Sequence, residues 1–206
     1  MSIQRTLLAS VIVAAAGGTI LMGATDRFQA FTTETARRVA LRQHPVATPA
    51  VVMLETQSGA RINLADLRGQ WLLIDFIYTR CSTSCVALGD EFAQLQDRLG
   101  APLARGSVRL LSISFDPAHD TPARLATYLQ RSRSRAAGWL AARPVTPEGL
   151  AQIKRVFGIT IIPNAQGGYT HNAAIHIVDP RGRLVAILDR GNPGRVARIL
   201  LRELGQ

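Results

Sequence analysis

The only two cysteines of the chain, Cys81 and Cys85, stand four residues apart between two patterned stretches. The apolar run 71–78 before them is typical of a buried central strand, and Leu88 and Phe92 after them recur at helical spacing. Four residues make about one helical turn, so both sulfurs should face the same side of a helix N-terminus. The partial positive charge and free N–H groups of a helix N-terminus lower a thiol's pKa and favour the thiolate.

Two neighbouring thiolates can form and exchange a disulfide, or they can bind a soft metal ion such as Cu(I). Thioredoxin-like oxidoreductases usually separate their cysteines by two residues, whereas three residues separate them here. The wider spacing still permits a disulfide, and it leaves room for an ion between the sulfurs. Two unrelated cysteines that merely pack are the structural alternative, which their shared position at one strand–helix junction disfavours.

A Cu(I) ion held by two thiolates needs one more donor for a trigonal shell. His171 is the best placed, because it lies in a loop that enters the next core strand, and the glycines of this loop let it fold over the cysteines. His119, in a turn after the second central strand, is a reserve candidate on the same side of the sheet. The remaining donors are interpreted as a partly buried structural residue, His176, a solvent-exposed residue, His44, and two packing residues, Met22 and Met53.

Apolar runs predict five strands, and capping signals predict three helix starts. The strands are expected at Val51–Glu55, Trp71–Tyr78, Val108–Phe115, Ala173–Asp179 and Leu184–Asp189. The helices are expected to begin at Thr121-Pro122, Thr146-Pro147 and Asn192-Pro193, and Gly158 should end the second of them. A turn at Asp179–Gly182 should join the last two strands in a hairpin.

The order of these elements predicts an α/β domain with a mixed sheet flanked by helices. Strand–helix alternation comes first and a hairpin later, after a small N-terminal strand pair. This is the order of a thioredoxin-like domain with N-terminal additions and an insertion between Gly158 and His171. A hydrophobic fraction of 47% excludes a disordered chain, and the length outside the first segment suits one core.

The chain divides into an apolar segment over residues 1–25, a tether over 26–46 and a folded domain over 47–206. The stretch Leu7–Ala24 carries no charge and would span roughly 27 Å as a helix, enough for a bilayer core. We favour an uncleaved membrane anchor over a cleaved signal peptide, whose apolar region is usually shorter. With the positively charged N-terminus inside, the folded domain would lie outside the cytoplasm. In the tether, Pro45 would interrupt any helix.

The formal net charge of +10 does not indicate a nucleic-acid partner. The arginines are scattered along the chain, and aromatic residues make up only 5% of it, which argues against a protein that stacks on bases. A basic surface can still steer the protein toward an acidic partner or anionic lipid.

Four stretches together resemble the SCO/SenC family of thioredoxin-like copper chaperones, and the resemblance covers about residues 47–190. The stretches are Leu67–Phe76, Tyr78–Cys85, Ser112–Pro122 followed by Leu125 and Tyr128, and Tyr169–His171 with Ile175–Gly182. The family implies metal binding by both cysteines of C-x-x-x-C and by the later histidine, which are Cys81, Cys85 and His171 here.

The resemblance also implies a cargo, a partner and a location. The cargo is a copper ion, Cu(I) with Cu(II) as an open alternative, and the recipient is the subunit of cytochrome c oxidase that carries the binuclear copper site. Other copper carriers or thiol reductants would supply the metal or the electrons. The domain would be tethered to the cytoplasmic (inner) membrane by the N-terminal segment and would face the periplasm.

Two functional hypotheses follow from the same residues. In the first, the chain is a metallochaperone in which reduced Cys81 and Cys85 bind Cu(I) and His171 completes the site. In the second, it is a thiol–disulfide oxidoreductase of the cell envelope that acts on partner cysteines. Here Cys81 and Cys85 are the redox-active pair, and His171 has no essential part.

Overall fold

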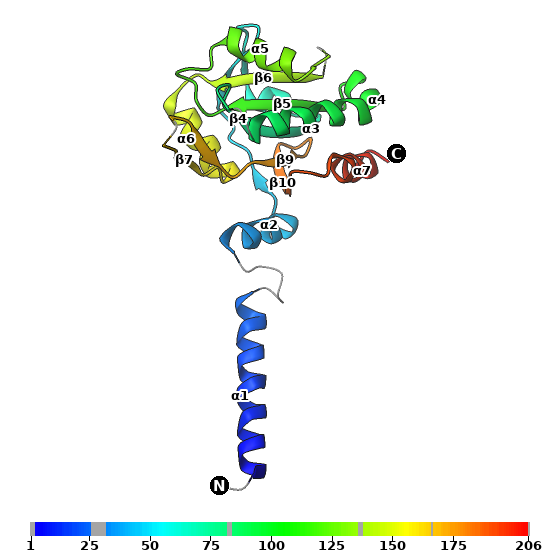
Figure 1. Ribbon diagram of the computed structural model, residues 1–206. Coiled ribbons are helices and arrows are strands. Elements are labelled where there is room, and N and C mark those ends of the chain that lie inside the picture. Colours follow the sequence, from blue (N-terminus) through cyan, green and yellow to red (C-terminus); the bar gives the residue numbers. More distant parts are fainter. Residues whose placement is uncertain (1–2, 26–31, 82–83, 136–137, 166, 206) are drawn as a thin grey trace. The chain divides into compact units, whose positions relative to one another are not determined.

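Figure 1 shows the chain as a computed structural model, which describes residues 3–25, 32–81, 84–135, 138–165 and 167–205. The chain forms two units, Met1–His44 and Pro45–Gln206, and each is described by itself. The first part of the predicted tether, residues 26–31, lies outside the described residues.

The N-terminal unit contains two helices, α1 (Ile3–Ala24) and α2 (Thr33–Gln43). Within the described part of the chain, α1 is the one helix that is long and apolar enough to cross a membrane. The composition of the tether does not predict α2, which begins where the Thr32 hydroxyl accepts the N–H of Thr35. It ends two residues before Pro45, as the missing N–H of proline requires.

The second unit is built on a mixed sheet of eight strands, and the predicted central strands are confirmed at its middle. The central pair, β4 (Trp71–Ile77) and β5 (Val108–Ser114), is parallel and aligned from Trp71–Val108 to Ile77–Ser114. The strand order is β1-β10-β9-β4-β5-β6-β2-β3. The outer members are β1 (Val46–Ala47), β2 (Met53–Thr56), β3 (Arg61–Asn63), β6 (Trp139–Pro144), β9 (Ala174–Val178) and β10 (Arg183–Asp189).

Two parts of the sheet test the predicted connections. The antiparallel hairpin β9–β10 and the small N-terminal pair β2–β3 are both confirmed. Strand β6 was not predicted, because Ala141, Ala142 and Arg143 weaken its apolar pattern, yet it pairs parallel with β5. The insertion after Gly158 forms a separate two-stranded hairpin, β7 (Ile161–Pro163) and β8 (Tyr169–His171).

The predicted helix starts are confirmed by their caps. Thr121, Thr146 and Asn192 each accept a backbone N–H at the start of α5 (Pro122–Arg131), α6 (Pro147–Phe157) and α7 (Pro193–Glu203). Gly158 ends α6 in the left-handed conformation, with φ of 68°, which glycine adopts without strain. The remaining helical segments are η1 (Leu64–Leu67), α3 (Ser84–Arg98) and α4 (Gly100–Ala104).

Aromatic contacts show that α3 and α5 cover the same face of the sheet. The Trp139 ring on β6 lies 5.6 Å from Phe92 of α3 and 6.4 Å from Tyr128 of α5, measured between ring centroids. Both helices connect parallel strands, and right-handed crossovers place such helices on one side. Along the chain, the first turn of α3 follows the end of β4, and Cys81 lies between them.

The opposite face of the sheet is covered by α6. Phe157 of α6 packs 5.2 Å from Phe76 of β4 and 5.6 Å from His176 of β9. Side chains alternate along a strand, so Asp75, next to Phe76, points instead toward the face that carries Tyr128. The domain is thus a mixed sheet with helices on both sides.

Asp75 is a fully buried carboxyl group at the centre of the sheet, and within the described chain its oxygens have no hydrogen-bond partner of good geometry. Burial raises its pKa from 3.8 to about 7, and the nearby Glu91 adds to this. Between these two pH values the native chain therefore holds a proton that the unfolded chain has lost. The contribution of this proton to the free energy of unfolding is fully present below pH 3.8 and is lost as the pH rises to about 7.

We expect the Asp75→Asn substitution to stabilise the chain at pH 8 more than at pH 4, because an amide has no charge to bury. The gain should grow by roughly 2–4 kcal/mol across this range. The measurement is guanidinium unfolding followed by tryptophan fluorescence. The matched control is Asp97→Asn, at an exposed surface ion pair, which should change stability little at either pH. An equal gain from Asp75→Asn at both pH values would contradict the assignment.

Candidate metal centre

The two cysteines lie where the sequence predicts them, at the junction of β4 and α3. Cys81 follows the strand after a three-residue loop, and Cys85 lies in the first turn of the helix. Both are free thiols and both are buried, with exposed fractions of 9% and 2%. The backbone N–H of Cys85 donates to the Cys81 sulfur at 3.3 Å. A helix N-terminal N–H thus supports negative charge on Cys81 Sγ.

The thiol of Cys85 has a different electrostatic environment from that of Cys81. A hydrogen bond to the Cys81 sulfur raises the pKa of Cys85 far above its usual range, and burial raises it further. The Cys85 thiol therefore keeps its proton at neutral pH. Binding of a metal ion by both sulfurs would release that proton.

His171 reaches the cysteines from a different part of the sequence. It is the last residue of β8, so the prediction that it lies in a loop is corrected to a short strand. Ile161 and Ile162 on β7, with Tyr169 on β8, favour strand pairing, and Gly167 turns the connection with φ of 73°. The hairpin brings the imidazole Nε2 to 3.8 Å from Cys85 Sγ.

The imidazole of His171 is held neutral by its surroundings. Burial lowers its pKa below 6.5, and the ring of Phe115 packs 5.0 Å from it. A neutral imidazole has a free lone pair, which metal coordination requires. The other ring nitrogen, Nδ1, is buried and has no hydrogen-bond partner among the described residues.

The 3.8 Å separation between sulfur and nitrogen fits two ligands of one ion. With bonds of about 2.3 Å to sulfur and 2.0 Å to nitrogen, the lengths known for zinc, ligands at 120° are about 3.7 Å apart. Cys85 and His171 are therefore spaced as two ligands of a trigonal ion. Over the described residues, however, no group of three His, Cys, Asp or Glu side chains is already arranged to hold a metal. A site in which Cys81 is the third ligand, beside Cys85 and His171, therefore requires at least one of the three donors to shift.

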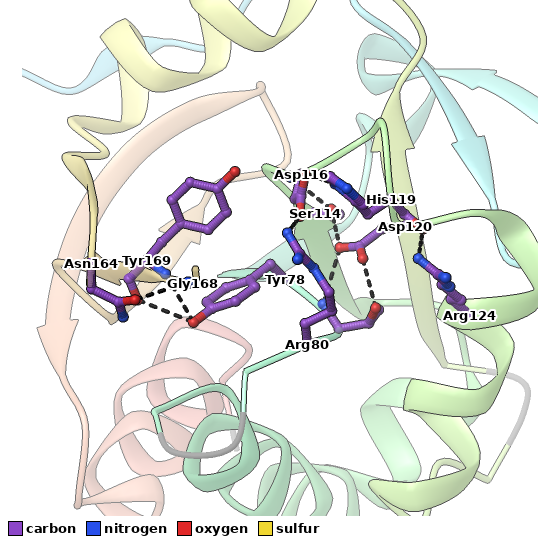
Figure 2. A network of polar contacts seen from close by, with 11 residues as sticks. Tyr78, Arg80, Ser114, Asp116, His119, Asp120, Arg124, Asn164, Gly168 and Tyr169 are labelled. Carbon is purple, nitrogen blue, oxygen red and sulfur yellow. Dashed lines mark hydrogen bonds and ion pairs between the residues drawn. The ribbon is translucent and has the colours of Figure 1, made fainter. Parts of the chain in front are cut away.

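Tyr78 fastens the β7–β8 hairpin to the segment that carries the cysteines. Its hydroxyl donates to the carbonyl of Tyr169 at 3.2 Å and accepts the N–H of the same residue at 3.1 Å (Figure 2). A Cβ on Gly168 would lie 2.9 Å from this hydroxyl, so the close approach needs a glycine there. Because Tyr169 is two residues from His171, this contact helps to determine how far the imidazole lies from the cysteines.

A second polar network holds the loop that leads into Cys81. Asp120 is completely buried, and its carboxylate accepts the N–H of Thr79 at 3.1 Å and the Thr79 hydroxyl at 2.6 Å. It also accepts the hydroxyl of Ser114 at 2.5 Å. Nearby, Asp116 binds Arg80 at 2.9 Å and His119 at 2.8 Å (Figure 2). Sequence reasoning gives these aspartates no role, although both lie in the motif that follows β5.

The other candidate donors are not grouped with Cys81, Cys85 and His171. The imidazole of His119 binds Asp116, and His176 is buried between Phe76 and Phe157, as its structural interpretation predicts. Met53 is 39% exposed on β2, so its interpretation as a packing residue is wrong. Met22 and His44 belong to the N-terminal unit.

The comparison with known families decides the classification. The SCO1/SenC family model matches residues 51–204, about three quarters of the chain. The chain belongs to the SCO1/SenC family. A relative from Stutzerimonas stutzeri, named "Putative copper-binding protein", is 28% identical over 89% of this chain and 88% of its own.

Solved structures of the family share the fold. The structure of Bradyrhizobium japonicum ScoI with copper bound is 27% identical, with a TM-score of 0.63 over 76% of this chain and 98% of its own. BsSco, described as a member of the Sco family of cytochrome c oxidase assembly proteins with a disulfide switch, is 21% identical, with a TM-score of 0.63 over 77% and 94%. The predicted thioredoxin-like fold, with a mixed sheet flanked by helices and an apolar N-terminal helix, is confirmed.

We expect Asp120→Asn to loosen the loop before Cys81, because its amide would place a donor against the donors of Thr79 and Ser114. The loss of unfolding free energy should be about 2–3 kcal/mol, the range for hydrogen bonds to a charged group. Denaturant unfolding measures the loss, and amide hydrogen exchange should show faster exchange at Thr79. The exposed Asp97→Asn control should change neither quantity. If the Asp120→Asn chain were as stable as the parent and exchange at Thr79 were unchanged, this network would not be what holds the loop before Cys81.

Proposed function

We propose that the chain is a membrane-tethered copper chaperone that delivers copper to, or maintains the thiols of, the binuclear copper site of cytochrome c oxidase. The observation that carries the proposal is the 3.8 Å separation of Cys85 Sγ and His171 Nε2, next to Cys81 at the same helix start. The copper-bound structure of the Bradyrhizobium japonicum relative and the family's link to oxidase assembly support it.

The chemistry of the three donors suits Cu(I). Two thiolates are soft ligands, and a neutral imidazole is a ligand that copper accepts readily. Cys85 gives up its proton when the ion binds, so affinity falls at low pH. Oxidation of Cys81 and Cys85 to a disulfide removes both thiolates and releases the ion. A partner's own cysteines would receive it by ligand exchange.

The location follows from α1 and from the chemistry. In this proposal α1 anchors the chain in the cytoplasmic (inner) membrane, and the folded domain faces the periplasm. The proposal places the binuclear copper site of the oxidase subunit in the same compartment, where other copper carriers or thiol reductants would load or reduce the pair. The N-terminal anchor keeps the cargo at the membrane surface where the recipient is assembled.

The second candidate is a thiol–disulfide oxidoreductase, favoured by the free pair and by the N–H that Cys81 Sγ accepts. In this reaction the Cys81 thiolate attacks a partner disulfide and forms a mixed disulfide. Cys85 then gives up its proton and attacks Cys81, so the partner leaves as two thiols and the chain as a disulfide. Two electrons pass to the partner, and His171 takes no part.

The first test is a competitive Cu(I) titration of the reduced full chain in neutral detergent. We expect Cys81→Ser/Cys85→Ser to abolish tight binding, and His171→Ala to weaken it roughly ten- to hundredfold. His119→Ala, which removes the reserve candidate, is the matched control and should bind as the parent does. Tight binding by the double serine variant would refute the proposal. Turnover of a protein disulfide by copper-free His171→Ala would favour the oxidoreductase.

A second test concerns the Tyr78 hydroxyl that positions the hairpin. We expect Tyr78→Phe to weaken Cu(I) binding severalfold, because the chain loses both hydrogen bonds to the Tyr169 backbone while the aromatic packing remains. Tyr169→Phe removes a hydroxyl from the same ring cluster without touching those bonds, so it serves as the control. Equal affinities for the two variants would show that the hairpin is held by packing alone.

A further inference from the structure

A cavity of about 370 Å³ opens beside the two sulfurs, between the start of α3 and the side of α5. Its lining includes Cys81, Cys85 and Val86 from the cysteine segment and Arg80, Arg124 and Arg131 around them. His171 is absent from the described residues that line it. The cavity therefore offers an approach to the sulfurs that does not pass the imidazole.

The charge around this cavity is positive and only partly compensated. Arg80 is neutralised by the buried Asp116. Arg124 and Arg131 are exposed on α5, and neither forms an ion pair within the described chain. The one acidic residue in the described lining, Asp90, is bound to Arg133 at 2.9 Å. Within the described chain both guanidinium groups thus lack a carboxylate partner, and Arg124 donates to the carbonyl of His119 at 2.6 Å (Figure 2).

The spacing of these two charges indicates the shape of an occupant. Arg124 and Arg131 are seven residues apart on one helix, which places them two turns, or roughly 10 Å, apart on one face. A peptide in the polyproline II conformation has three residues per turn and advances roughly 9 Å over them, so acidic side chains at positions i and i+3 lie on one face and would reach both guanidinium groups. A single carboxylate would reach only one. At the same rim, the exposed side chain of Val86 offers an apolar contact.

We propose that this cavity binds an extended, acidic, cysteine-bearing segment of a partner protein, laid along α5 so that its cysteine meets Cys81 Sγ. The proposal rests on the proposed function, because it names the chemistry of the segment that exchanges ligands or thiols with this site. The arginines select and orient the segment, and the cavity admits its sulfur. His171 stays on its own side of the pair while the partner's sulfur enters from the other.

The test uses the reduced, copper-free full chain in neutral detergent and two blocked peptides, Asp-Cys-Gly-Asp and Asn-Cys-Gly-Asn. Each peptide cysteine is joined to thionitrobenzoate by a disulfide. The Cys81 thiolate attacks the peptide sulfur, a new disulfide forms, and thionitrobenzoate leaves with the electron pair and is measured by its absorbance. We expect the acidic peptide to react roughly five- to thirtyfold faster than the amide peptide at low salt. The preference should shrink at high salt.

Variants identify the arginines as the cause. Arg124→Gln/Arg131→Gln should reduce the acidic preference to less than about twofold. Arg155→Gln/Arg198→Gln removes the same net charge from exposed positions on α6 and α7 and should keep the preference. No preference in the parent chain, or an equal loss in both double variants, would overturn the proposal. So would an equal acceleration of a small one-carboxylate disulfide such as that of thioglycolate.

The result is independent of copper binding. The exchange reaction needs only the reduced thiols, so an acidic preference without Cu(I) affinity would keep the cavity assignment and refute the chaperone proposal. Cu(I) affinity without an acidic preference would do the reverse.

Discussion

The arrangement of the candidate site depends on the Tyr78 hydroxyl, which both donates to and accepts from the backbone of Tyr169. This side chain comes from the loop between β4 and Cys81, and the backbone belongs to the hairpin that ends at His171. One hydroxyl group thus joins two segments separated by 91 positions in the sequence. A glycine at position 168 makes the approach close enough, and the ring of Tyr78 packs against those of Phe115 and Tyr169.

The cysteine side of the site is rigid for a different reason. The buried carboxyl group of Asp120 accepts three hydrogen bonds from Thr79 and Ser114, which tie the loop before Cys81 to the segment after β5. A buried charge of this kind is tolerated because every nearby donor points at it. The buried carboxyl of Asp75 lacks such donors, and burial raises its pKa to about 7.

Local patterns in the sequence predict the strand–helix junction, the helix caps and the last hairpin, because each depends on residues that are neighbours in the chain. They also predict the thioredoxin-like class. Strand β6 could not be predicted, because its short alanine-containing pattern becomes a strand only through pairing with β5. The role of Asp120 and the position of the hairpin that carries His171 likewise depend on partners about 40 and 90 residues away. The sequence motifs include these residues, but only the tertiary structure shows which residues they contact.

The unpartnered Nδ1 of His171 has a consequence for how long a cargo would remain bound. Histidines that bind a metal usually donate their other ring N–H to an acceptor, which fixes the orientation of the ring and raises its basicity. Within the described chain the Nδ1 of His171 has no such acceptor. Without such an acceptor the ring is held less firmly, so it should release a bound ion more easily than a histidine that has one.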